Sequence, residues 1–403
     1  MHNLYRFVSF CAAVVAFSCA SLEAGTTGDV FTPVIASTLS PEAHPILGTD
    51  GVYHVVYELQ LTNTKLVPAT MQKIEVLGST ESQVIISFSD ADLLKRLRTL
   101  APQPATDATI EPNGGRLFYI ELTFKDVAKI PKLLQHRLHL TGAPNPGPAK
   151  PAPLEYVVAA IKISDAKPLI IGPPLAGAGW VAANGCCNAD ITHRGSVQSV
   201  NGALYDSQRF AIDWMRLDDQ GRMVHGEEND VHNYNDYGAD VLAVADAKVV
   251  SVLNNLDDQV PGRLPEPSSI TIETVDGNHV ILDLGGGRFA FYAHLQKNSI
   301  RVRPGDAVKK GAVLGKLGNT GNTSAPHLHF HIMNRPSPIA ADGIPYLIDA
   351  FDLSGQIDIA AFEAAPALAG DWGKGRLAQS EPRQRQFPLN LNIINFASAN
   401  APK

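Results

Sequence analysis

Three histidines, His327, His329 and His331, alternate with apolar residues late in this chain. Successive side chains of a β-strand point to opposite faces, so this alternation places all three imidazoles on one face. The other face is apolar and can pack on a core; it is formed by Leu328, Phe330 and Ile332. Ring nitrogens held in this way can bind a metal ion or transfer a proton near neutral pH. The stretch therefore predicts a strand with one chemically active face.

The composition favours an all-β protein of two domains. The chain has 403 residues, enough for two domains that each bury a core. Its 28 Pro and 33 Gly, with 45% hydrophobic and 18% charged residues, indicate many turns between short strands. A formal net charge of −7, without a long basic run, argues against nucleic acid as a partner. The composition does not indicate an oligomeric state.

The N-terminus has the pattern of an export signal. Arg6 supplies a positive charge, and Phe7–Ala20 is an apolar run too short to cross a bilayer comfortably. We expect residues 1–24 to be a signal peptide and the product to be periplasmic or secreted. Cys19 raises the alternative of a lipid anchor, although the residues before it fit that signal poorly. No later segment is long and apolar enough to span a membrane.

Two adjacent cysteines, Cys186 and Cys187, remain after removal of such a signal. In an oxidising compartment they can form a vicinal disulfide or pair between chains. A redox role is disfavoured because the chain has no Cys-x-x-Cys spacing.

Residues 30–165 alternate short β-like runs with turns, which predicts an immunoglobulin-like sandwich with one short helix near residues 90–97. The expected strands cover residues 52–61, 73–77, 83–88, 116–124 and 154–163. The histidines of this part, His54, His136 and His139, have no cluster of other ligand types beside them. We interpret them as surface or hydrogen-bonded histidines without a chemical role.

Residues 166–179 are rich in Pro and Gly and form the expected linker. Residues 180–355 then predict a second domain, a mostly antiparallel sheet of short strands that includes one at residues 270–275. Asn201-Gly202 favours a hairpin turn between residues 192–199 and 207–214. Residues 356–403 form a C-terminal tail whose last apolar run suggests a final strand.

Five segments of the second domain resemble, in order and spacing, the blocks of the lysostaphin/LytM-type zinc metallopeptidases. They cover about a third of the chain, and they are residues 237–249, 292–295, 302–311, 317–322 and 326–330. Five ordered blocks are more specific than a single motif. The resemblance implies a zinc cofactor and a zinc-activated water that cleaves peptide cross-links or bridges of peptidoglycan. An export signal is consistent with that substrate.

Residue by residue, the resemblance makes Asp213 and His329 zinc ligands. It makes His294 and His327 the pair that orients and deprotonates the water and stabilises the transition state. The chemistry is consistent, because a zinc ion with one open position lowers the pKa of water and a neighbouring imidazole can relay the proton.

One position departs from the family pattern. The family places a histidine four residues before its aspartate, where this chain has Arg209. Arginine stays protonated and offers only donors, so it cannot bind zinc. The best substitute is His193. A hairpin turning at Asn201-Gly202 would bring residue 193 near residue 209. The simplest register pairs Arg194 with Arg209, so a one-residue bulge would be needed to put the His193 side chain on the same face as Asp213. His331 is the second candidate.

Three functions are compatible with these residues. The first is an exported zinc metallopeptidase acting on peptidoglycan, positioned by its N-terminal sandwich. The second is a metal-free binding module that binds the cell wall or regulates a wall hydrolase. The third is a zinc hydrolase for another peptide or an ester. Metal content separates the first function from the second.

Overall fold

Strands dominate the structure, as the composition predicts. A computed structural model describes residues 30–145, 150–365, 368 and 370–398. The expected signal peptide over residues 1–24 lies outside them. The α-helices of the described chain are short, and they are α1 (Asp90–Arg96) and α2 (Ile359–Ala364); its 3₁₀ helices are η1 (Val127–Lys129), η2 (Val231–Asn233), η3 (Pro267–Ser269) and η4 (Trp372–Gly375). No helix among these residues has the length and hydropathy of a membrane span.

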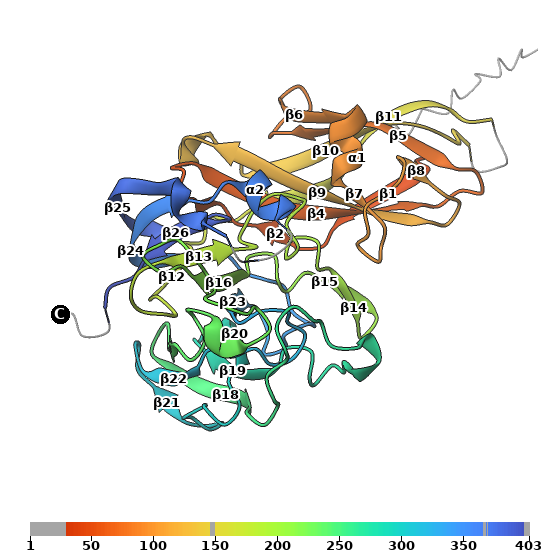
Figure 1. The fold of residues 1–403 in the computed structure, drawn as a ribbon. Coiled ribbons are helices and arrows are strands. Elements are labelled where there is room, and N and C mark those ends of the chain that lie inside the picture. Colours follow the sequence, from red (N-terminus) through yellow and green to blue (C-terminus); the bar gives the residue numbers. More distant parts are fainter. Residues whose placement is uncertain (1–29, 146–149, 366–367, 369, 399–403) are drawn as a thin grey trace, which may run out of the picture. The chain divides into compact units, whose positions relative to one another are not determined.

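Two sheets are formed by the first part of the chain, and we call this part the sandwich (Val34–Ile163; Figure 1). One sheet has the order β1-β4-β9-β7, with β3 beside β4; its strands are β1 (Val34–Thr38), β3 (Ile46–Leu47), β4 (Tyr53–Asn63), β7 (Leu97–Arg98) and β9 (Gly115–Phe124). The other has the order β2-β11-β10-β5-β6, with β8 beside β5; its strands are β2 (Glu42–Ala43), β5 (Ala69–Leu77), β6 (Val84–Ser89), β8 (Thr109–Ile110), β10 (Leu133–Gly142) and β11 (Ala152–Ile163).

Apolar residues of both sheets share one core, which explains why the sheets face each other. Tyr57 and Leu59 of β4 meet Leu138 and Leu140 of β10 in this cluster. The alternation of apolar residues along the strands therefore builds a two-layer sandwich, as expected. That its strand order is immunoglobulin-like stays a prediction.

The remaining strands form the largest sheet of the described chain, which we call the central sheet. It is mostly antiparallel, with the order β12-β24-β26-β13-β16-β23-β20-β19-β18-β21 and β25 beside β24. Its strands are β12 (Leu169–Ile171), β13 (Trp180–Ala183), β16 (Ile212–Arg216), β18 (Ala247–Leu253), β19 (Asn278–Asp283), β20 (Phe289–Leu295), β21 (Ala307–Val308), β23 (Leu328–Met333), β24 (Tyr346–Gln356), β25 (Arg376–Gln386) and β26 (Asn392–Asn395). Two small pairs accompany it, β14 (Gln198–Val200) with β15 (Ala203–Tyr205) and β17 (Asp240–Leu242) with β22 (Val313–Lys316).

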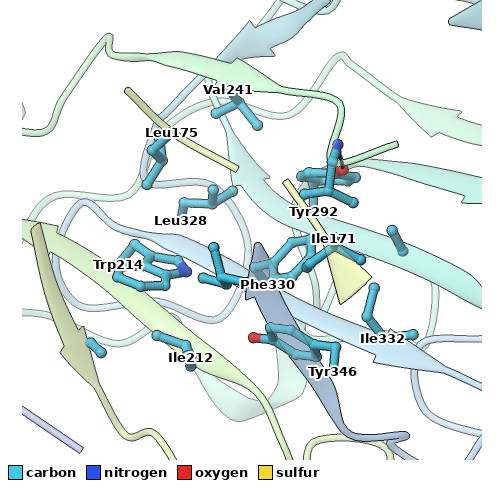
Figure 2. Close-up of a cluster of buried hydrophobic side chains, with 14 of the residues drawn as sticks. Ile171, Leu175, Ile212, Trp214, Val241, Tyr292, Leu328, Phe330, Ile332 and Tyr346 are labelled. Carbon is cyan, nitrogen blue, oxygen red and sulfur yellow. Dashed lines mark hydrogen bonds between the residues drawn. The ribbon is translucent and has the colours of Figure 1, made fainter. Parts of the chain in front are cut away.

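Strand β23 is the histidine-rich stretch, and both of its faces are buried. Its apolar face enters the main core, where Leu328, Phe330 and Ile332 lie among Trp214 and Tyr346 (Figure 2). The predicted division of this strand into an apolar and a histidine face is therefore confirmed. The packing on one side fixes the direction of the imidazoles on the other.

The central sheet extends beyond the expected second domain. The expected linker, residues 166–179, contributes β12, which pairs with β24. The expected tail, residues 356–403, contributes β25 and β26, and β26 pairs with both β13 and β24. The sheet that carries the histidines therefore needs residues on both sides of the 180–355 segment.

Two local predictions were wrong. Residues 270–275 form turns rather than a strand, since Ile272 is exposed and has no core to enter. The hairpin turn at Asn201-Gly202 does form, with positive φ at both residues, but its strands are only β14 and β15. The hairpin ends before it reaches residues 193 and 209.

Candidate functional site

Strand pairing brings Asp213 and His329 together. Asp213 on β16 lies directly opposite His329 on β23, so their side chains share one face of the central sheet. His329 Nδ1 lies 2.9 Å from Asp213 Oδ1. Both residues are buried, which keeps the carboxylate and the imidazole close in a region of low water content.

His193 reaches the same carboxylate from a loop. Its Nε2 lies 3.3 Å from Asp213 Oδ2. Its Nδ1 is 3.0 Å from the carbonyl oxygen of Asn184 and 3.1 Å from that of Ala211. Because carbonyls only accept, Nδ1 carries a proton, and Nε2 is the ring nitrogen that faces Asp213.

The path of the chain to this position differs from the expected hairpin. Strand β13 pairs with β16, and Ala183 lies opposite Asp213. The loop from Asn184 to Val197, which we call the His193 loop, leaves β13 beside the site and turns back to place His193 there. Asn184 also donates from Nδ2 to Asp213 Oδ2 at 2.8 Å, a contact that the sequence did not indicate.

His294 joins the site through an unusual backbone. It follows Ala293, which is opposite His329, so a regular strand would turn the His294 side chain to the other face. Its φ of 62° reverses this direction, and its ring lies 4.7 Å from that of His327. Such a conformation costs about 1–3 kcal/mol in a residue other than glycine and is concentrated at functional sites. Its Nδ1–H donates to the carbonyl oxygen of Thr320 at 2.7 Å, which leaves Nε2 unprotonated.

His327 lies just before β23, on the solvent side of the cluster. Its Nδ1–H donates to the carbonyl oxygen of Ala325 at 2.8 Å, and its Nε2 lies 3.3 Å from Asp213 Oδ1. Its side chain is 14% exposed, against 5% for His329 and 6% for His193. Of these histidines it is therefore the one most accessible to a substrate.

Burial and the neighbouring charges shift the pKa values of Asp213 and His327 in opposite directions. Burial alone would raise the pKa of Asp213, but His193 and His327 hold it well below its ordinary value. Burial lowers the pKa of His329 to about 4 and that of His294 well below 6.5. For His327 burial acts in the same direction, but the Asp213 charge outweighs it and raises the pKa. The arrangement is an ionised carboxylate surrounded by imidazoles of different basicity.

His331 lies behind His329 and not among the possible ligands. Its Nδ1 is 3.0 Å from His329 Nε2, and its ring packs against Phe291 with the centroids 5.1 Å apart. It is fully buried, which lowers its pKa well below 6.5 and keeps it neutral. Its Nδ1 can therefore accept a hydrogen bond from His329 Nε2–H, which would leave Nδ1 of His329 free to bind a metal.

Arg209 points away from the cluster. Its guanidinium donates to both carboxylate oxygens of Glu58 on β4 and is 3% exposed. Arg209 therefore binds a carboxylate of the chain itself and does not face Asp213 or His329. Glu58 was not singled out from the sequence. The one signal for it is that Glu58 is the single acidic residue in the apolar run of residues 55–61.

The donor atoms fit a metal ion. Ligand atoms of His193, Asp213 and His329 all lie within 4.8 Å of one another, as do those of His294, His327 and His329. Two imidazoles and a carboxylate are a common donor set for catalytic zinc, with a further position left open. His331 belongs to no such group in the described residues.

Comparisons with known proteins concern one segment of the chain. Residues 231–341 match the model of peptidase family M23. This segment is similar to the M23 peptidases. It is 38% identical over 65 residues to the peptidoglycan DD-endopeptidase ShyA of Vibrio cholerae, covering 16% of this chain and 15% of that protein. It is 38% identical over 77 residues to the glycyl-glycine endopeptidase ALE-1 of Staphylococcus capitis, covering 18% of this chain and 21% of that protein.

These matched segments are short, so the chain spans less than a quarter of the length of either relative. Among solved structures, the catalytic domain of lysostaphin from Staphylococcus simulans is 23% identical, covering 36% of this chain and 80% of that one with a TM-score of 0.22. The resemblance to the M23 peptidases that the five sequence blocks indicate is confirmed by the family match.

Proposed function

We propose that this protein is an exported zinc metallopeptidase that hydrolyses peptide bonds in peptidoglycan cross-links. The observation that carries the proposal is the convergence of His193, Asp213 and His329, whose donor atoms lie within 4.8 Å of one another. His193 supplies the imidazole that Arg209 cannot. The relatives named as peptidoglycan endopeptidases support the substrate class.

A zinc ion held by these residues would act as a Lewis acid that polarises a carbonyl and makes water nucleophilic near neutral pH. His294 and His327 lie beside this position with Nδ1 fixed on backbone carbonyls. Their Nε2 atoms are therefore free to accept a proton. His327 is the more exposed of the two, so it is better placed to take a proton from water and to return it to the leaving amine.

Two cavities open beside segments that carry the hydrogen-bond partners of this pair. One, of about 300 Å³, is lined by Ala325, whose carbonyl oxygen accepts from His327, and by Tyr234, Phe362 and Trp372. The other, of about 280 Å³, is lined by Gly321, the residue after Thr320, and by a mixture of polar and apolar residues that includes Gln259 and Ile270. These cavities offer room for a peptide close to the cluster.

The metal-free binding module is the less favoured function. It rested on the absence of a third ligand at residue 209, and the position of His193 Nε2, 3.3 Å from Asp213 Oδ2, supports the metallopeptidase instead. The positive φ at His294 also favours catalysis, since it turns the side chain towards the cluster and such conformations are concentrated at functional sites.

The proposal is tested by incubating the purified zinc-loaded chain with peptidoglycan and analysing the released fragments by mass spectrometry. The names of the relatives specify different bonds, so the protein is given two substrates, peptidoglycan with direct cross-links and peptidoglycan with glycine bridges. We expect cleavage of one type, its loss with a chelator, and its recovery on adding zinc. Absence of cleavage of either substrate by zinc-loaded protein would contradict the proposal.

A further inference from the structure

The sandwich contacts the site through a buried group of charges at Glu58. Strand β4 places Val55, Tyr57 and Leu59 in the core of the sandwich, so Glu58 points to the opposite face. That face is covered rather than solvated, since Glu58 is 0% exposed. A carboxylate buried to this extent needs cationic partners.

Two arginines of the second part of the chain supply these charges. Arg209 donates from Nε to Glu58 Oε2 at 2.9 Å and from Nη2 to the same oxygen at 2.6 Å. Arg194, which is 1% exposed, donates from Nη1 to Glu58 Oε1. Asp206 is a second acid beside the two arginines, and its Oδ2 lies 3.5 Å from Arg209 Nε and 3.7 Å from Arg194 Nη1.

Arg194 is the residue after His193, so its attachment determines where the His193 ring lies. Besides Glu58, its guanidinium donates from Nη2 to the carbonyl oxygen of Ile120 at 3.3 Å and lies 5.2 Å from the centre of the Tyr119 ring. Both residues belong to β9 of the sandwich. On the other side of the backbone, the His193 ring faces Asp213.

The sandwich holds the rest of the His193 loop as well. Arg98 of β7 donates from Nη2 to the carbonyl oxygen of Ala189 and to Asp190 Oδ1, both at 3.2 Å. Ala189 and Val197 pack against Leu117 and Tyr119 in one apolar cluster. The sandwich therefore holds the loop from Ala189 to Val197, and no residue of the loop belongs to a regular strand.

From these contacts we propose that Glu58 is a positioning residue for the metal site: through Arg194 it holds His193 at the ligand position, so that the sandwich sets the metal affinity of the peptidase domain. This inference rests on the proposed function, because it takes His193 to be a ligand. Arg209, at the position where a ligand is missing, helps to hold Glu58 in place by donating to its second carboxylate oxygen, Oε2.

The test compares zinc dissociation constants of full-length variants by chelator competition, together with the visible absorption spectrum of the Co²⁺-loaded protein. In Glu58→Gln the charge that holds Arg194 is removed. We expect its zinc dissociation constant to rise about 10- to 100-fold, as for other residues that orient a ligand. The Co²⁺ spectrum should change, because the ligand set changes.

Glu75→Gln is the matched control. Glu75 is also a buried glutamate of the sandwich, paired with Lys73 at 2.6 Å and Arg137 at 2.9 Å, but it contacts no residue of the His193 loop. Its loss should lower the melting temperature and leave the zinc affinity and the Co²⁺ spectrum unchanged. A purely structural role of Glu58 would give the same result as this control.

Arg98→Gln provides a second variant in case Glu58→Gln does not fold. It removes a different anchor of the loop and should raise the zinc dissociation constant several-fold. Folded variants of Glu58 or Arg98 with the parent affinity and spectrum would overturn the inference alone. A parent protein that binds neither zinc nor Co²⁺ would overturn the proposed function, and the inference with it.

Discussion

Arg209 and Glu58 lie 151 residues apart in the sequence and form a buried two-point ion pair, with Arg209 Nη2 2.6 Å and Nε 2.9 Å from Glu58 Oε2. Arginine suits this position because its planar guanidinium binds a carboxylate at two points and stays charged when buried. A histidine would be too short to make both bonds. The residue that interrupts the family pattern therefore has a structural function of its own.

Arg209→His tests whether the parent site is complete. We expect this change to lower the free energy of unfolding by about 3–5 kcal/mol, because it leaves a buried carboxylate poorly paired. Zinc affinity should not rise, since we assign the third ligand position to His193. Urea denaturation and chelator competition measure the two quantities, with the exposed Arg335→His as a control. A gain in zinc affinity or activity would show that His193 was not serving as a ligand.

His327→Ala and His329→Ala separate the two proposed roles. His327 is assigned to proton transfer, so its loss should abolish hydrolysis and leave about one zinc per chain. His329 is assigned to the metal, so its loss should remove both activity and zinc. Metal content by atomic spectroscopy, measured beside peptidoglycan cleavage, distinguishes the variants. Equal loss of metal in both would contradict this division of roles.

His136 predicts a dependence of stability on pH that is independent of the site. It is fully buried on β10, its Nδ1–H donates to the carbonyl oxygen of Ala159 at 2.6 Å, and its Nε2 accepts from Tyr57 at 2.8 Å. Burial lowers its pKa from 6.5 to about 4. Between these values the unfolded chain binds a proton that the folded chain does not, so stability falls as the pH drops from 6.5 towards 4.

The loss attributable to His136 is about 3 kcal/mol at the acid end of that range. His136→Gln removes the titrating group, so its unfolding free energy should fall less between neutral pH and about pH 4 than that of the parent. Urea denaturation at the two pH values provides the measurement. A loss of the same size in both proteins would assign the acid sensitivity to other groups.

Truncation after Gly355 tests how much of the chain the central sheet needs. The deletion removes β26, whose Ile393 and Ile394 are 0% exposed and pair with β13. Since β13 lies beside β16, which carries Asp213, we expect the truncated chain to lose its cooperative thermal transition. A chain ending at Ala397 is the control and should melt like the parent. A folded product ending at Gly355 would restore the boundary that the sequence suggested.

Part of the cluster could be predicted because its signals are local. The alternation in residues 327–332 determines a strand face, and the resemblance to the family adds Asp213 and His294, which the structure brings beside that face. Strand β10 was not predicted from the sequence. Its alternate residues Leu134, Leu138 and Leu140 are buried, but the histidines and the arginine between them make the apolar alternation hard to recognise. Polar residues in a half-buried strand hide its period.

The route of His193 could not be predicted for a different reason. The Asn-Gly turn was identified correctly, but the number of residues that pair beyond a turn depends on tertiary contacts. Here the sandwich holds the chain from Ala189 to Arg194 before the hairpin begins. A contact between residues as distant as 58 and 194 leaves no periodic signal in one sequence, so His193 lies near Asp213 by a route that the sequence did not predict.

The most direct test of the account is the zinc content and zinc dissociation constant of the full-length protein and of His193→Ala. His232→Ala is the matched control, since the His232 side chain is 75% exposed and pairs with Asp230 rather than with a residue of the cluster. We predict about one zinc per chain in the parent and in His232→Ala, and an affinity at least tenfold weaker in His193→Ala. A parent without zinc, or a His193→Ala variant that binds zinc as tightly as the parent, would contradict the assignment of His193 as the third ligand.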